Sequence, residues 1–121
     1  MTVTGEVFKS YAEAIVKAHG FGSKKMVLDW STDFLKGVNE TIREAGKGTP
    51  EQDVALEMWE KCYDGQEFLL KNEYIRTYRP EWTGWKGRKP VRRRGSLYVG
   101  LTEKGWAVAH LYLNEGGENN G

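Results

Sequence analysis

The residues best able to do chemistry lie in the stretch 76–94, where aromatic rings alternate with positive charges. It holds eight basic residues and one acid, Glu81, while the rest of the chain holds ten of the 18 cations and 16 of the 17 acids. The basic residues are Arg76, Arg79, Lys86, Arg88, Lys89, Arg92, Arg93 and Arg94. Tyr78, Trp82 and Trp85 lie among them. Arginine pairs with phosphate and flat rings stack on bases, so this mixture predicts a nucleic-acid contact. The alternative is a solvated hairpin whose tryptophans cover a small core.

Residues suited to catalysis or metal binding are few. The two histidines, His19 and His110, are far apart, and no carboxylate cluster accompanies them at a metal-ligand spacing. His19 suits the end of a helix, and His110 falls in an apolar setting typical of a structural histidine. Cys62 lies on an apolar helical face, which favours a reduced, buried thiol. The sequence therefore predicts a protein that is not an enzyme and has no cofactor and no metal.

Length and composition set the domain organisation. The 121 residues predict one domain over 1–115, followed by a glycine-rich, polar tail over 116–121 that we expect to be disordered. The first residues lack the pattern of a signal peptide, and no stretch approaches the roughly 20 apolar residues of a membrane span. We expect a soluble, cytoplasmic protein that does not bind a membrane.

The first half of the chain shows helical periodicity. Thr4 is placed to cap a helix over 5–19, in which apolar residues recur every three or four positions from Phe8 to Val16. Ser23 is placed to cap a second helix with an inward stripe. That stripe is Val27, Trp30, Phe34, Val38 and Ile42. Gly37 and the polar segment 31–33 leave open a kink or two shorter helices.

The third helix has the most specific start signal. Thr49 caps it, Pro50 occupies the first turn, and Gln52 is placed to bond back to the cap. Its expected buried residues are Ala55, Met58, Trp59 and Cys62. The helix either continues through 64–65 to residue 71, or a short fourth helix covers 66–71 with Phe68, Leu69 and Leu70 inward. We expect Asn72 to end it in the left-handed conformation.

Two strands and a final helix complete the pattern. The segments 74–79 and 96–101 alternate as strands do, with 80–95 between them as a long basic loop, so together they form a hairpin with a large tip. Thr102 is placed to cap a helix over 103–113. We expect its inward residues to be Trp106, Ala109, His110 and Leu113. This helix is apolar almost all round, which predicts a homodimer or packing between two layers.

Two short motifs carry a family resemblance. The wing-like strand 96–101 runs directly into Leu101-Thr102-Glu103-Lys104-Gly105 at a helix start, and the segment 69–76 joins a leucine-rich helix end to an apolar pair and a basic residue. Both resemble winged-helix transcriptional regulators of the MarR and PadR kind. The resemblance implies an α+β winged-helix fold with three or four helices, a two-stranded β-hairpin wing and a C-terminal helix. It also implies that Arg88, Lys89, Arg92, Arg93 and Arg94 lie along the DNA backbone or enter the minor groove.

The helix before the wing departs from that family because it is acidic. A recognition helix presents basic and amide groups to the major groove. This helix instead presents Glu51, Asp53, Glu57, Glu60, Asp64 and Glu67. Three interpretations follow: the wing alone contacts DNA, only 66–71 inserts, or the acidic face binds another protein.

Two functions fit these observations. The first is a non-enzymatic DNA-binding protein, of the transcriptional regulator class, that uses the basic wing and the rings of Trp82 and Trp85. The alternative is a small phage- or plasmid-encoded interaction protein, such as an anti-CRISPR-type inhibitor, that docks on a nucleic-acid-handling complex. The acidic helix and the five tryptophans favour the alternative, since tryptophan is common at interface centres.

Overall fold

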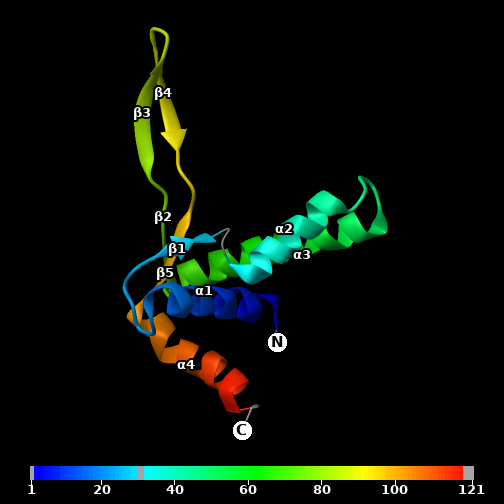
Figure 1. Ribbon diagram of the computed structural model, residues 1–121, viewed down its shortest axis with the longest axis vertical. Coiled ribbons are helices and arrows are strands. Elements are labelled where there is room, and N and C mark those ends of the chain that lie inside the picture. The colour runs from blue at the N-terminus through cyan, green and yellow to red at the C-terminus, as the bar shows by residue number, and fades with distance from the viewer. Residues whose placement is uncertain (1, 30–31, 119–121) are drawn as a thin grey trace.

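The computed structural model describes residues 2–29 and 32–118 and has an α+β fold (Figure 1). Its elements follow one another as α1 (Val3–His19), β1 (Val27–Leu28), α2 (Asp33–Glu44), α3 (Pro50–Lys71), β2 (Ile75–Tyr78), β3 (Glu81–Lys86), β4 (Lys89–Arg94), β5 (Tyr98–Leu101) and α4 (Glu103–Glu118). The expected α+β class, with helices and a β-hairpin, is confirmed at this level.

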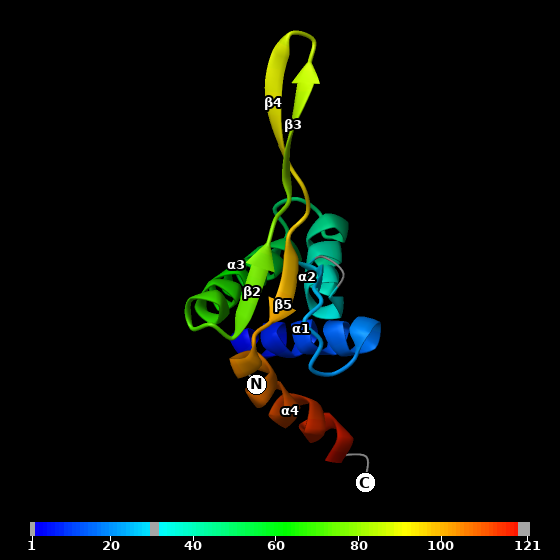
Figure 2. The same cartoon turned by 90° about the vertical axis from the view of Figure 1, so that its left-hand side faces the viewer.

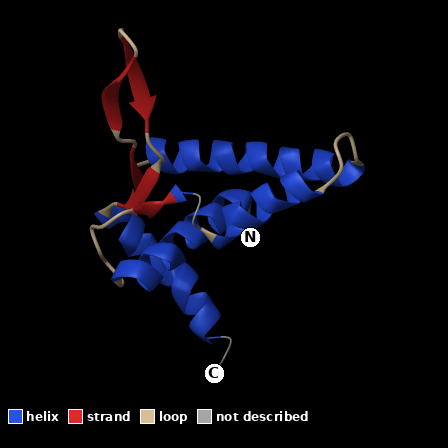
Figure 3. Cartoon of the chain, turned by 45° about the horizontal axis from the view of Figure 1, so that its top comes forward, coloured by secondary structure: helices blue, strands red, loops and turns tan. Residues whose placement is uncertain are grey.

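Two antiparallel sheets divide the strands. The first has the order β1-β5-β2, and the second is formed by β3 and β4. Figure 3 shows all the strands on one side of the molecule, with the helices beside and below them. The core lies where α1 crosses the first sheet, and Tyr11, Ile15, Ile75 and Val99 are completely or almost completely buried there. Burying such side chains supplies most of the driving force for folding.

Three parts project from this core in different directions. The β3–β4 hairpin extends away from one end of the body in both side views, and α4 lies at the opposite end (Figures 1 and 2). The helices α2 and α3 lie side by side and project laterally (Figures 1 and 3). The hairpin and the α2–α3 pair are therefore separate arms.

Helix α1 begins two residues before its expected start. The cap is Thr2, whose hydroxyl accepts a hydrogen bond from the backbone N–H of Gly5 at 3.1 Å. Thr4, the expected cap, lies inside the helix and close to α3. A Cβ placed on Gly65 would be 3.1 Å from the Cα of Thr4. Gly65 therefore permits close packing of α1 on α3, rather than interrupting α3.

The expected second helix is wrong in its first half. Residues 23–26 are not helical, and Val27 and Leu28 form a strand that pairs with Val99 and Tyr98 of β5. Helix α2 begins only at Asp33. Trp30 of the expected stripe and Ser31 of the segment 31–33 lie outside the described residues. The spacing of apolar residues resembled a single helix because Val27, which is buried in β1, precedes a helical stripe in α2. That stripe is Phe34, Val38 and Ile42.

Helix α3 confirms the expected start and continues without a break to Lys71. The hydroxyl of Thr49 accepts from the N–H of Gln52 at 3.3 Å, while the Gln52 side chain accepts from Gly48, one residue before the cap, at 3.1 Å. Ala55 and Cys62 are buried, and Met58 and Trp59 are partly buried. The helix ends at Lys71, as expected, but the residue in the left-handed conformation is Glu73, with a φ of 62°, and not Asn72.

Helix α4 begins as expected, since the hydroxyl of Thr102 accepts from the N–H of Gly105 at 3.0 Å. It continues to Glu118, so 116–118 are helical and only 119–121 of the expected tail lie outside the described residues. Ala109 is buried and Trp106 and Leu113 are partly buried, but His110 is exposed, so its expected apolar setting is wrong. The homodimer through this helix stays a prediction. None of the helices in the described part of the chain combines the length and the apolar character that a membrane span requires.

Candidate nucleic-acid interface

The basic segment is an extended ribbon and not the long loop that was expected. Strands β3 and β4 pair over six positions, from Glu81 opposite Arg94 to Lys86 opposite Lys89. A two-residue turn, Gly87-Arg88, joins them, and Gly87 has a φ of +65°. A positive φ at the first central residue suits the right-handed twist of a tight hairpin, and glycine adopts it without a steric penalty. We call residues 81–94 the basic hairpin.

Both faces of the basic hairpin carry cations and a tryptophan. Side chains directly opposite each other in an antiparallel pair share a face, and successive residues alternate between faces. From the register, one face holds Glu81, Thr83, Trp85, Pro90, Arg92 and Arg94, and the other holds Trp82, Gly84, Lys86, Lys89, Val91 and Arg93. Arg88 lies in the turn. Positive charge therefore surrounds the ribbon.

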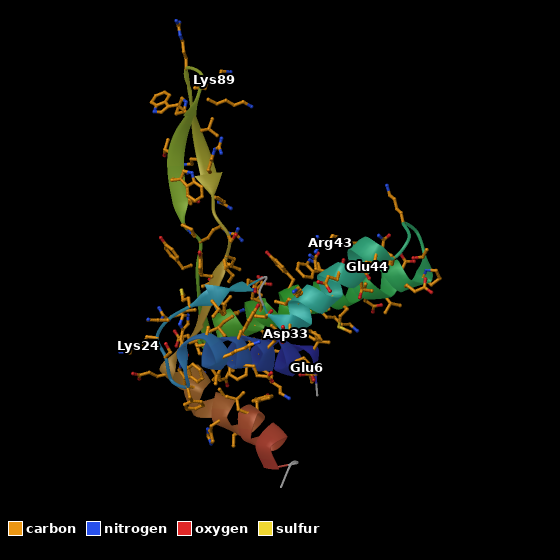
Figure 4. All side chains as sticks on the ribbon, in the orientation of Figure 1. Glu6, Lys24, Asp33, Arg43, Glu44 and Lys89 are labelled. Atoms are coloured by element: carbon orange, nitrogen blue, oxygen red, sulfur yellow. The ribbon has the colours of Figure 1, made fainter. Side chains whose placement is uncertain are left out.

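Most of these cations are available to a ligand. The side chains of Lys86, Arg88, Lys89, Arg92 and Arg93 are exposed and make no hydrogen bond or ion pair with another described residue. Figure 4 places Lys89 near the outer end of the ribbon, well separated from the acidic side chains labelled on the helices. The cations are thus gathered on the projecting hairpin, and among the residues that the structure describes only one of them, Arg94, is paired with a carboxylate.

The paired cation, Arg94, is the last residue of β4. Its Nε donates to Oε1 of Glu81 at 3.1 Å, and both side chains are exposed. The two residues face each other across the ribbon, so the local net charge of this pair is zero. Arg94 therefore contributes less to the attraction of a polyanion than its neighbours do.

Arg76 and Arg79 belong to the base of the hairpin. The guanidinium of Arg76 donates to the carbonyl of Lys24, and Nη1 of Arg79 donates to the carbonyl of Gly95 at 3.0 Å. The N–H of Gly95 donates in turn to the carbonyl of Pro80 at 2.8 Å. These two arginines, predicted as site residues, therefore stabilise the backbone at the base of the basic hairpin. Their charges lie nearer the sheet than the tip.

The two tryptophans have different surroundings. Trp82 lies at the base, where a Cβ on Gly95 would be 3.1 Å from its ring and 2.6 Å from the ring of Pro80. Trp85 lies one residue from the turn and is 72% exposed, the largest exposed fraction among the large hydrophobic residues that the structure describes. Trp82 is thus close to the base of the hairpin although 52% exposed, whereas Trp85 is the more exposed of the two.

The acidic residues of α3 lie on the other arm, and all six are exposed. Large apolar side chains are exposed among them. These are Val54, Leu56, Tyr63, Phe68 and Leu70. The expectation that Phe68 and Leu70 face inward with Leu69 is wrong, because only Leu69 is buried. Leu56, Tyr63 and Leu70 are spaced by seven residues and so recur on one side of a helix, which was not predicted as a surface. This side of α3 combines negative charge with apolar area.

A buried polar cluster joins three segments of the core and was also missed. The hydroxyl of Tyr11 donates to Oδ1 of Asp29 at 2.6 Å, and Nε2 of Gln66 donates to both groups, at 2.7 and 3.1 Å. Burial raises the pKa of Asp29 above its usual value, and burial with the nearby Asp29 raises that of Tyr11. Burial also raises the pKa of Cys62 to about 11, so its thiol is protonated and weakly nucleophilic at neutral pH. These groups are suited to a structural role.

Neither metal-ligating groups nor known proteins indicate a further site. Within the described residues, no group of three His, Cys, Asp or Glu side chains is placed to hold a metal ion. Searches against protein-family models, curated proteins and solved structures found no match to this chain. A function must therefore be argued from the geometry of the chain itself.

Proposed function

We propose that this protein binds duplex DNA through the basic hairpin. The observation that carries the proposal is a projecting two-stranded ribbon with five exposed, unpaired cations on two faces and a turn. A two-stranded ribbon fits the major groove of B-DNA, and ribbons in other DNA-binding proteins enter either groove. Cations on both faces would meet the phosphates of both strands.

The charge of the hairpin indicates how strongly salt would weaken binding. Each phosphate that a cation neutralises releases condensed counterions, and five contacts give a slope of about −4.5 in a plot of log affinity against log salt. This slope is large enough to measure and is set by the number of contacts. It therefore tests the role of the five free cations directly.

The order of the elements supports a winged-helix arrangement for this proposal. Three helices and a short strand precede the hairpin, and the sheet order β1-β5-β2 places the hairpin between two neighbouring strands, as a wing requires. The arrangement departs from a helix-turn-helix because α2 and α3 lie side by side (Figures 1 and 3), whereas the helices of that motif cross at roughly 90–120°. The wing would then act without a recognition helix.

The end of α3 gives little support to insertion of 66–71 into a groove. Gln66, the amide that could read a base, donates two hydrogen bonds into the core, to Tyr11 and Asp29. Glu67 beside it is acidic and exposed, so it would be repelled by phosphate. Of the interpretations open at the level of sequence, contact by the wing alone is therefore favoured.

The test is a matched pair of triple variants. Arg88→Gln, Arg92→Gln and Arg93→Gln together remove three free charges from the hairpin, and Lys17→Gln, Lys36→Gln and Lys47→Gln remove three exposed charges elsewhere. Affinity for a random duplex is measured by fluorescence anisotropy over a range of salt. We expect the first set to flatten the slope by about 2.7, and the second to leave it nearly unchanged.

Equal flattening by both sets would show that only net charge matters and would remove the hairpin from the proposal. Failure of the unmodified protein to bind duplex at low salt would refute it altogether. A class of DNA targets, such as operators of a regulated gene, would have to be sought by selection from random sequence, because phosphate contacts carry no sequence information.

A second candidate function is docking on another protein through α3. The exposed Leu56, Tyr63 and Leu70 favour it, since large apolar groups together at a surface mark interaction sites. The six carboxylates around them specify a partner with a basic surface, as expected for a protein that handles nucleic acid. A phage- or plasmid-encoded inhibitor would have this character. Binding that is lost in Tyr63→Ala but retained in the hairpin triple variant would favour this function.

A further inference from the structure

We infer that Trp85 and Pro90 form an apolar wedge that enters an opened base step, so that the basic hairpin prefers duplex DNA with a weakened or easily kinked step. This inference rests on the proposed function and adds to it a class of target. It also separates the roles of the two tryptophans, which the sequence alone treats alike.

Trp85 faces Pro90 across the ribbon, and its side chain makes no hydrogen bond, ion pair or ring contact with another described residue. It is 72% exposed. Trp82 is 52% exposed, but its ring lies close to Gly95 at the base of the hairpin. The structure therefore gives Trp82 a neighbour at the base, and it gives no comparable packing reason for a tryptophan at residue 85.

The spacing of cations along the ribbon suits a groove. Strand residues advance about 3.4 Å each, so Arg92 lies about 7 Å from Pro90 towards the base, and Lys86 and Lys89 lie one position from the pair towards the turn. Successive phosphates of one DNA strand are about 3.4 Å apart along the helix axis. A ribbon that lies along a groove with the Trp85–Pro90 face towards the bases therefore carries cations on both sides of the wedge at the spacing of phosphates.

The chemistry of the pair suits insertion. Tryptophan presents a wide aromatic face for stacking, and proline is a compact apolar group of the kind that other proteins insert between base pairs. Insertion requires unstacking, which is least costly at a mismatch and low at flexible pyrimidine–purine steps. The wedge should therefore bind a duplex with a central mismatch more tightly than its fully paired counterpart.

The test compares Trp85→Thr with the unmodified protein on these two duplexes. Threonine keeps a good β-former in the strand and removes the ring. We expect the variant to bind the mismatched duplex about 5- to 150-fold more weakly, the range for loss of one stacked base. Its salt slope should be unchanged, because no charge is removed. Tyr63→Thr, which removes an exposed ring from α3, is the matched control and should bind as the unmodified protein does.

A second readout follows the base itself. With 2-aminopurine beside the mismatch, binding of the unmodified protein should change the fluorescence of that base, and Trp85→Phe should retain most of the change because it keeps a ring. Trp85→Thr should abolish it. Equal affinities of Trp85→Thr and the unmodified protein, or an unchanged preference for the mismatch, would overturn the wedge while leaving DNA binding by the hairpin in place. Absence of binding by the unmodified protein would instead refute the proposed function.

Discussion

Replacing Glu81 by glutamine should strengthen DNA binding. In the structure, Glu81 accepts from Nε of Arg94 at 3.1 Å, and both side chains are exposed on the same face of the ribbon. Glu81→Gln removes one negative charge and releases the charge of Arg94. One additional phosphate contact steepens the salt slope by about 0.9, from about −4.5 to about −5.4. At 0.1 M salt this corresponds to about an eightfold gain in affinity.

The cost in stability should be small, because an exposed ion pair contributes only about 0.2–1 kcal/mol. The assay is fluorescence anisotropy with a labelled random duplex at several salt concentrations, together with thermal unfolding. Two further variants, Arg94→Gln and the double variant, complete a double-mutant cycle for this ion pair. Arg94→Gln leaves Glu81 unpaired next to phosphate and should weaken binding, whereas the double variant restores a net charge of zero at this position and should bind much as the unmodified protein does.

Two outcomes would refute this reasoning. An unchanged salt slope in Glu81→Gln would show that Arg94 lies beyond reach of the DNA. A double variant as weak as Arg94→Gln would show that Arg94 contacts phosphate despite its partner, so that the pair opens on binding. Either result would change the number of contacts from which the slope of the unmodified protein is calculated.

The base of the hairpin and the buried cluster give two further predictions. Gly95→Ala places a Cβ 2.6 Å from Pro80, so we expect a loss of stability of about 1–3 kcal/mol in chemical denaturation together with weaker DNA binding, whereas Gly84→Ala, in open space on the same ribbon, should show neither loss. The raised pKa of Asp29 means that its stabilising contribution is present below the usual value of 3.8 and is lost as pH rises through the higher folded value. Asp29→Asn keeps an acceptor for Tyr11 without the charge, so the stability of this variant relative to the unmodified protein should increase from about pH 4 to pH 7, and a difference independent of pH would contradict this account.

Local signals in the sequence were sufficient where structure depends on neighbouring residues. Thr49, Pro50 and Gln52 specify the start of α3 through contacts within a few positions, and the cap forms as expected. Thr102 does the same for α4. Short-range hydrogen bonds of this kind can be recognised without knowledge of the remaining fold.

Structure that depends on distant partners was not predictable in this way. Val27 and Leu28 form a strand only because β5, about 70 positions later, provides hydrogen-bond partners. Glycine commonly interrupts a helix, but Gly65 lies within the continuous helix α3. Its missing side chain allows Thr4 of α1 to pack closely against it. In both cases tertiary contacts override local preference.

The candidate site shows the same division. Its cations were evident from composition, but composition does not indicate that Arg94 is paired with Glu81 or that Arg76 and Arg79 hold the base of the hairpin. The pairing of Arg94 depends on the register of β3 against β4, and the contacts of Arg76 and Arg79 depend on partners outside these two strands. A shift of one residue would move every side chain to the other face, and charge composition carries no information about that register.

The separation of charge in space also favours the hairpin over α3 as the surface for the proposed DNA binding. An acidic helix next to the basic hairpin would offset its field, since charges are screened over about 8–10 Å at physiological ionic strength. Here α3 projects laterally and the hairpin extends from the end of the body, so the tip is removed from α3 (Figure 1). The hairpin can then attract a polyanion while α3 stays directed away from it. The same separation leaves the apolar and acidic face of α3 accessible when DNA is bound, so the two candidate functions require different arms and are physically compatible in one molecule.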